Sequence, residues 1–129
     1  MPGKLLDTTA LIDLSRGQIA AADFLDGERE AGTPLFVSIV SAMEFIVGCR
    51  NKAELAKAQK LLSDFQLIQL NSAISQKACT LLLTYTLSHG LMIPDALIAA
   101  TSLTESLQLM SDNDHHFKMI SGLVVTRPY

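Results

Sequence analysis

The amino-acid sequence predicts a single α/β domain, residues 1–129, with a mostly parallel five-stranded sheet flanked by helices. Short apolar runs alternate with longer segments of helical periodicity, which is the pattern of parallel strands joined by crossover helices. Charged residues make up 18% of the chain, against about 25% in an average domain, and the mean hydropathy is +0.31. This apolar surplus indicates a sheet buried on both faces or a surface reserved for a partner.

The first expected strand, residues 3–6, is an apolar run that ends abruptly at Asp7. Its position places a carboxylate just beyond the carboxyl end of the strand. Thr8 or Thr9 is then expected to cap the short helical turn over residues 10–15.

A longer helix, residues 18–31, ends at Gly32, where a glycine typically stops a helix. Its inward side chains are expected to be Ile19, Ala22 and Leu25. The second strand, residues 35–37, leads to Ser38, a natural N-cap for a helix that reaches Gly48.

The middle of the chain continues with a helix over residues 52–64, a third strand over 67–70 and a long helix capped by Ser72 that runs through Leu87. The apolar stripe of the first of these helices is expected to be Leu55, Ala58, Leu61 and Leu62.

One carboxylate stands at the head of the most apolar helix. Pro94 suits a first helical position, so this helix is expected to begin at Pro94 or Asp95. Residues 96–100 are all apolar, which predicts an interior helix. The positive end of the helix dipole favours a carboxylate and keeps it ionised. Alternatively, Asp95 only caps the helix.

Strands over residues 108–110 and 123–125 complete the expected sheet, with a polar turn over 112–116 between them. Parallel sheets bind ligands beyond the carboxyl ends of their strands, where the strand order reverses. Asp7 and residues 111–114 are therefore expected at the same rim, where the Ser111 hydroxyl either orients a carboxylate or only ends a strand.

Glu44 is a second unusual carboxylate. On a helix that starts near Ser38 it shares one face with Val40 and Val47. A carboxylate in an apolar row is costly unless it is paired, protonated or bound to a cation. The alternative is a capping box, in which Ser41 caps the helix and Glu44 only satisfies a backbone N–H.

The candidate site residues are carboxylates and one amide from four separate segments: Asp7, Glu44, Asp95, Asp112, Asn113 and Asp114. Converging carboxylates repel one another and raise each other's pKa, so the arrangement makes sense mainly if a divalent cation compensates the charge. Oxygen ligands suit Mg²⁺ or Mn²⁺. Such an ion can polarise a phosphoryl oxygen and activate water, so phosphodiester hydrolysis is the expected reaction.

Net charge and cysteine content limit the possible ligands and the cellular compartment. The net charge is −3, so no global basic field attracts nucleic acid. A helix face with Lys52, Lys57 and Lys60, next to Arg50, either follows phosphates or is only solvated. Two cysteines without metal or redox spacing, and no long apolar run, indicate a cytoplasmic protein without a membrane segment.

Together these residues resemble a known family, the PIN-domain ribonucleases, and within it the VapC-like toxins of bacterial type II toxin-antitoxin systems. The resemblance covers nearly the whole chain. Four ordered motifs carry it: residues 5–12, residues 37–44, residues 88–91 with 93–101, and residues 109–113 with 116–117.

The resemblance implies a PIN-like three-layer sandwich, Mg²⁺- or Mn²⁺-dependent endoribonuclease activity on RNA, inhibition by a cognate antitoxin, and a homodimer. The family's metal ligands and catalytic positions fall on Asp7, Glu44, Asp95 and Asn113. Asp112 and Asp114 flank the last of these, and which of the three faces the metal stays open. Thr86 stands where many relatives have a basic residue after the tyrosine.

Two rival interpretations remain. Aspartyl-phosphate chemistry on Asp7 needs a second acid two residues later, where this chain has Thr9. A binding module that keeps the fold and binds metal or a partner protein without turnover is the second alternative. Retention of all three acids argues against it.

Overall fold

The computed structural model describes residues 3–129 and contains a five-stranded sheet with the order β3-β2-β1-β4-β5. Every neighbouring pair of strands is parallel, which confirms the predicted fold class. The strands are β1 (Lys4–Leu6), β2 (Leu35–Ser38), β3 (Gln66–Ile68), β4 (Gln108–Met110) and β5 (Val125–Thr126). The fourth strand has the range expected from sequence, the first and second each differ from theirs by one residue, and the third and fifth differ by one or two.

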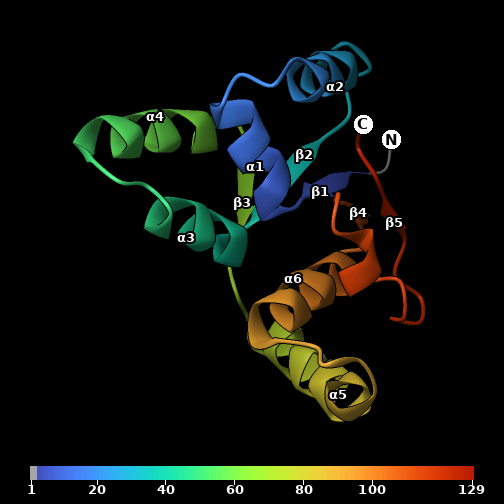
Figure 1. The fold of residues 1–129 in the computed structure, drawn as a ribbon. Helices are drawn as coiled ribbons and strands as arrows, with labels where there is room; N and C mark the ends of the chain where they lie inside the picture. The colour runs from blue at the N-terminus through green and yellow to red at the C-terminus, as the bar shows by residue number, and fades with distance from the viewer. Residues whose placement is uncertain (1–2) are drawn as a thin grey trace.

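Helices cover both faces of this sheet (Figure 1). They are α1 (Thr8–Ser15), α2 (Ile19–Glu30), α3 (Ile39–Val47), α4 (Lys52–Leu62), α5 (Ser72–His89) and α6 (Ile93–Thr104), followed by the 3₁₀ turn η1 (Asp114–His116). The helices α5 and α6 pack together on one face, and α1 to α4 lie on the other. The molecule is therefore the expected three-layer sandwich.

The central strand explains why the sequence reads as continuous apolar runs. Leu5 belongs to the hydrophobic cluster beneath α5 and α6, and its neighbour Leu6 belongs to the cluster beneath α1 to α4. Successive side chains of a strand point to opposite faces, so both must be apolar where both faces are covered.

The apolar helix α6 is buried as expected, with Ala96, Ile98, Ala99 and Ala100 fully enclosed. Two other expectations about inward faces are wrong in part. Ile19 is 77% exposed and Ala22 is exposed as well, whereas Leu25 faces the core as predicted, together with Ala21. Leu55 is also exposed, whereas the other predicted residues of the α4 stripe, Ala58, Leu61 and Leu62, pack in or against the core.

The helix caps differ in part from those expected. Ser38 caps α3 as predicted, since its hydroxyl accepts a hydrogen bond from Val40 N at 3.1 Å. Asp7, not Thr8 or Thr9, caps α1, and Asn71, not Ser72, caps α5. In both cases the carboxyl or amide oxygen comes one residue earlier than the expected hydroxyl and accepts a backbone N–H of the first turn.

The helix α5 runs two residues beyond its expected end and stops at Gly90, whose φ of +66° is a left-handed conformation that glycine adopts without strain. Within residues 3–129, no helix combines the length and the apolarity needed to cross a bilayer.

Candidate active site

The candidate site lies at the carboxyl ends of β1 and β4. These strands are direct neighbours, with Leu6 opposite Met110, and Asp7 N donates a hydrogen bond to Met110 O at 3.1 Å. The chain leaves β1 toward β2 on one side, whereas β4 lies on the other side, so the strand order reverses here. The structure therefore puts the segments after β1 and β4 at the rim that the sequence predicted.

Asp7 is the anchor of the site. Its side chain is 5% exposed and accepts three hydrogen bonds: from Thr8 N at 2.7 Å, from Ser111 Oγ at 2.7 Å and from Thr9 Oγ1 at 3.4 Å. These donors and the N-terminus of α1 offset the cost of burying a carboxylate. The Asp7 carboxylate is therefore held in one orientation.

Asp95 lies in the first turn of α6, as the sequence predicted, and is partly buried. Burial raises its pKa, repulsion from Asp7 and then from Glu44 raises it further, and His116 opposes the shift. The His116 Nδ1 atom is 3.7 Å from Asp95 Oδ2. Burial and the neighbouring carboxylates therefore act against the helix dipole, which was expected to favour the ionised form.

Glu44 does not lie in the buried row that the sequence predicted. It is exposed, and Val47 on the same face of α3 is 83% exposed. The buried face of α3 is formed by Ser41, Ala42 and Phe45, because α3 lies at the rim of the sheet and turns this other face inward. The capping-box alternative is also wrong, since Ser38 is the cap.

Glu44 instead points toward the start of α1. Thr8 Oγ1 donates a hydrogen bond to Glu44 Oε1 at 2.7 Å, and Thr8 N binds Asp7. Thr8 thus links the two carboxylates. Sequence reasoning considered this threonine only as a cap, and an adjacent Asp-Thr pair gives no signal for the second contact.

The turn after β4 divides its three polar residues between two environments. Asn113 Nδ2 donates to Thr9 Oγ1 at 3.4 Å, and Asn113 N donates to Ser111 Oγ at 3.1 Å. Asp114 forms ion pairs with Lys118 at 3.0 Å and Arg127 at 3.3 Å, whose hydrogen bonds hold the pKa of Asp114 below its ordinary value. Asn113 therefore faces the site, whereas the carboxylate of Asp114 is paired with Lys118 and Arg127.

The pKa of Asp112 is shifted by several charged neighbours. Burial raises its pKa, and repulsion from Asp13, Asp7 and Asp114 adds to this shift against the attraction of Arg127. Asp13 in turn accepts a hydrogen bond from the Tyr129 hydroxyl, so the end of the chain folds back against α1. The sequence analysis missed both Asp13 and Tyr129, because one polar residue in a helical turn and one terminal aromatic residue carry no pattern.

The donor set fits a hard divalent cation in chemistry. All candidate ligands offer oxygen. The negative charges of Asp7 and Glu44 repel that of Asp95, and a bound cation would compensate this repulsion. With the side chains as they lie, no three His, Cys, Asp or Glu residues within 3–129 are close enough to hold one ion together.

Comparison with known proteins agrees with this geometry. The family model described as "PIN domain" matches residues 4–123. Ribonuclease VapC10 of Mycobacterium tuberculosis is 38% identical over 120 residues, which cover 92% of this chain and 89% of that protein. Ribonuclease VapC19 of the same species is 32% identical over 121 residues, covering 93% of this chain and 96% of that protein.

A solved structure titled "Toxin-antitoxin complex from Klebsiella pneumoniae" contains a chain that is 32% identical and superposes with a TM-score of 0.80, covering 98% of both chains. The agreement thus extends over nearly the full length in sequence and in fold. The chain described here belongs to the PIN domain family and is one of its VapC-like members.

Proposed function

We propose that this protein is a metal-dependent endoribonuclease that acts as the toxin of a toxin-antitoxin pair. The observation that carries the proposal is that Thr8 links the carboxylates of Asp7 and Glu44, whose charges both raise the pKa of Asp95, beside the point where the strand order reverses. The names of the relatives support the same reaction, because the two mycobacterial proteins are called ribonucleases. The Klebsiella structure supports an antitoxin as the partner.

The proposed ligands of one or more Mg²⁺ or Mn²⁺ ions are Asp7, Glu44 and Asp95, together with the turn 112–114. Within that turn, the contacts favour Asn113 and Asp112, because Asp114 is already paired with Lys118 and Arg127. When bound, the metal would supply the polarisation of a phosphoryl oxygen and the activation of water.

The protein's own residues position the reaction. Ser111, Thr8 and Thr9 fix the Asp7 carboxylate, so a ligand at this point meets an oriented acceptor. Glu44 is exposed and held by the Thr8 hydroxyl, so an extended RNA strand can approach it from solvent. His116, 3.7 Å from Asp95 and half exposed, lies where it can contact a bound phosphate.

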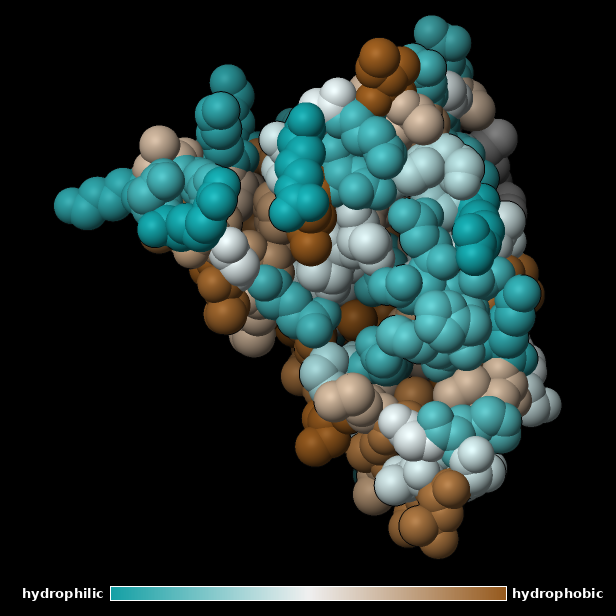
Figure 2. All heavy atoms as spheres, in the orientation of Figure 1, coloured by the Kyte–Doolittle hydropathy of each residue, from teal (hydrophilic) through white to brown (hydrophobic). Residues whose placement is uncertain are grey.

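A homodimer is part of the proposal. Large apolar side chains are exposed on α3, on α5 and at the start of α6: Met43, Val47, Leu83, Leu87, Met92 and Ile93. The lower part of Figure 2, where α5 lies in Figure 1, shows hydrophobic surface. Such side chains favour a protein interface, since monomeric proteins rarely expose large apolar patches.

The free thiols of Cys49 and Cys79 fit action in the cytoplasm, where RNA is the substrate.

The test is RNA cleavage by purified protein freed of any co-expressed partner. Structured RNA is incubated in Mg²⁺ or Mn²⁺, with EDTA and the Asp95→Asn variant as negative controls. Asp26→Asn, an exposed site on α2, is the matched control for the same chemical change.

Cleavage that needs the metal, disappears in Asp95→Asn and persists in Asp26→Asn supports the proposal. Metal binding without cleavage of any RNA favours the alternative, a PIN-fold module that binds without turnover.

A further inference from the structure

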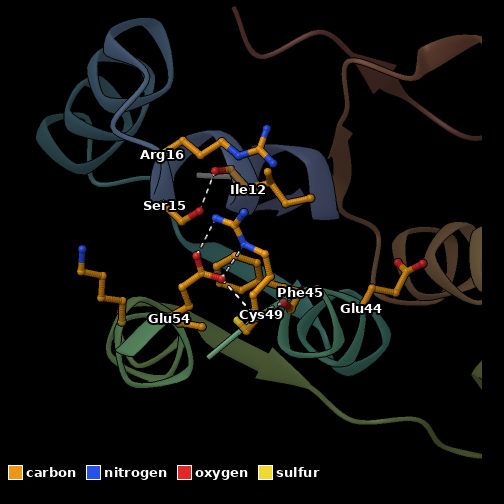
Figure 3. Close-up of a pocket in the computed structure, with 11 residues that line it drawn as sticks. Ile12, Ser15, Arg16, Glu44, Phe45, Cys49 and Glu54 are labelled. Carbon is orange, nitrogen blue, oxygen red and sulfur yellow. Dashed lines mark hydrogen bonds and ion pairs between the residues drawn. The ribbon is translucent and has the colours of Figure 1, made fainter. Parts of the chain in front are cut away.

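A pocket of about 430 Å³ lies beside the carboxylates, between α1, α3 and α4. Figure 3 shows Arg16 at one side of this pocket, Glu54 at the other, and Glu44 at the end away from Glu54. Glu44 accepts the hydrogen bond from Thr8, whose backbone N–H binds Asp7. The pocket and the carboxylate site therefore share one wall.

Cations outnumber anions in the lining. Arg16, Arg50 and Lys57 are positive, and Glu44 and Glu54 are negative. Glu54 is already engaged, because Arg50 Nη2 and Nε donate to its two oxygens at 2.9 and 3.4 Å. Arg16 and Lys57 are exposed and form no ion pair with any residue from 3 to 129. Neither cation is held by a direct ion pair within these residues, although the charge of Lys57 helps to lower the pKa of Glu54, so both can contact an anionic ligand.

We propose that this pocket binds the phosphates of the RNA strand that flank the cleaved bond, with Arg16 and Lys57 as the contacting cations. The inference rests on the proposed ribonuclease function and names a substrate subsite for it. Guanidinium and ammonium groups are the usual phosphate partners in proteins. The chain's net charge of −3 makes such a local group necessary for RNA binding.

The spacing fits a strand that continues from the carboxylates. Thr8 and Arg16 are separated by the eight-residue helix α1, which at 1.5 Å per residue spans about 12 Å. A stacked nucleic-acid strand advances about 3.4 Å per phosphate, so this distance corresponds to roughly three phosphates. An RNA strand bound at Asp7 therefore needs only about three further phosphates to span the distance to Arg16.

The test measures binding of a fluorescently labelled, 12-nucleotide single-stranded RNA in EDTA, so that no cleavage occurs. Arg16→Gln and Lys57→Gln are each expected to raise Kd about tenfold. Each is also expected to lower the slope of log Kd against log salt concentration by about 0.7, the value for one lost phosphate contact on a single strand. Lys60→Gln, on the same helix as Lys57 but outside the pocket, is the matched control and keeps wild-type values.

A variant that removes a negative charge from the pocket distinguishes an electrostatic role from a structural one. Glu54→Gln removes a negative charge from the pocket while keeping an oxygen that can accept the hydrogen bond from Arg50 N. It is expected to tighten RNA binding. Circular dichroism and thermal unfolding of every variant establish that the fold is retained, and a purely structural role of these residues would move Tm without changing the salt slope.

Cleavage of the same RNA in Mn²⁺ separates this inference from the function it rests on. In an active protein, Arg16→Gln and Lys57→Gln are expected to raise KM and leave kcat nearly unchanged, because they remove binding that is equal in ground and transition states. Unchanged Kd, salt slope and KM in an active enzyme would overturn the pocket assignment alone. So would variants that bind RNA normally and lose only affinity for a cognate antitoxin, since the pocket would then be a protein-docking site.

A wild-type protein that cleaves no RNA would overturn the proposed function. RNA binding that still depends on Arg16 and Lys57 would, in that case, leave the pocket assignment standing.

Discussion

The Ser111 hydroxyl donates a 2.7 Å hydrogen bond to Asp7 Oδ2 across the two central strands of the sheet. Both side chains are buried, with 1% of Ser111 and 5% of Asp7 exposed. The same hydroxyl oxygen accepts the backbone N–H of Asn113. One serine therefore couples the orientation of the buried carboxylate to the turn that carries the fourth candidate ligand.

Ser111→Ala is expected to lower metal affinity and cleavage about 10- to 100-fold, the usual effect of losing a group that orients a ligand. Mn²⁺ titration calorimetry and cleavage rates measure the two effects. Ser63→Ala is the control, because Ser63 is exposed and its hydroxyl donates to the backbone carbonyl of Lys60. Wild-type metal affinity in Ser111→Ala would show that Asp7 needs no help from the neighbouring strand.

Metal binding is expected to stabilise the fold. An ion that binds only the folded state contributes about 2.7 kcal/mol at a concentration 100 times its Kd. Thermal unfolding with Mn²⁺ should therefore give a higher Tm than unfolding in EDTA. Asp95→Asn should lose most of this increase and should unfold in EDTA at or above the wild-type Tm, because burial and repulsion already disfavour its charge. A much lower Tm in EDTA would mean that Asp95 serves the fold.

A buried hydroxyl in α3 predicts a stabilising substitution. The Ser41 hydroxyl is fully enclosed and has no hydrogen-bond partner in the part of the chain that the structure describes. Ser41→Ala is therefore expected to raise the free energy of unfolding by about 1 kcal/mol.

Ser102→Ala is the matched comparison with the opposite sign. Ser102 is equally buried, but its hydroxyl donates to Leu107 O, so its loss should lower the free energy of unfolding by about 1 to 2 kcal/mol. Urea unfolding measures both changes, and equal effects of the two substitutions would contradict the assignment of the Ser41 hydroxyl as unpaired.

The ion pair between Lys4 and Glu28 predicts a pH-dependent contribution to stability. Burial alone would raise the pKa of Glu28, but the hydrogen bonds from Lys4 and Thr33 outweigh it and lower the pKa below its ordinary value of 4.5. A carboxyl whose pKa is lower in the folded state stabilises the protein above its unfolded pKa. This contribution disappears as the pH falls through the lower, folded value.

Glu28→Gln should therefore destabilise the protein by about 1 kcal/mol at pH 7. Its difference from wild type should shrink below about pH 4.5. Urea unfolding of both proteins from pH 3 to 7 measures this difference, and a constant difference across the range would exclude the ion pair as its cause.

The sequence predicted most of the fold because its information is local and periodic. Apolar runs bounded by caps located all five strands within two residues, and the unbroken apolar stretch after Asp95 identified the buried helix. The positions of Asp7 and Asp95 were predicted correctly because each stands at an element end. Periodicity could not say which face of α3 turns inward, so Glu44 was placed in the right element and in the wrong environment.

Contacts between distant segments had no sequence signal. Thr8 with Glu44, and Tyr129 with Asp13, depend on how α1 lies against α3 and against the end of the chain. Which residues of the turn 112–114 face the site depends likewise on Lys118 and Arg127, which pair with Asp114.

The central claim is that Asp7, Glu44 and Asp95 form one metal-dependent RNA-cleaving site. The most direct measurement compares the Mn²⁺ concentration that half-activates RNA cleavage with the Kd for Mn²⁺, in wild type, Asp95→Asn and the control Asp26→Asn. In wild type and in Asp26→Asn, we expect the half-activating Mn²⁺ concentration to equal the Kd for Mn²⁺. In Asp95→Asn, we expect cleavage to fall at least about 100-fold. Cleavage that survives in EDTA, or that Asp95→Asn performs at the wild-type rate, would contradict it.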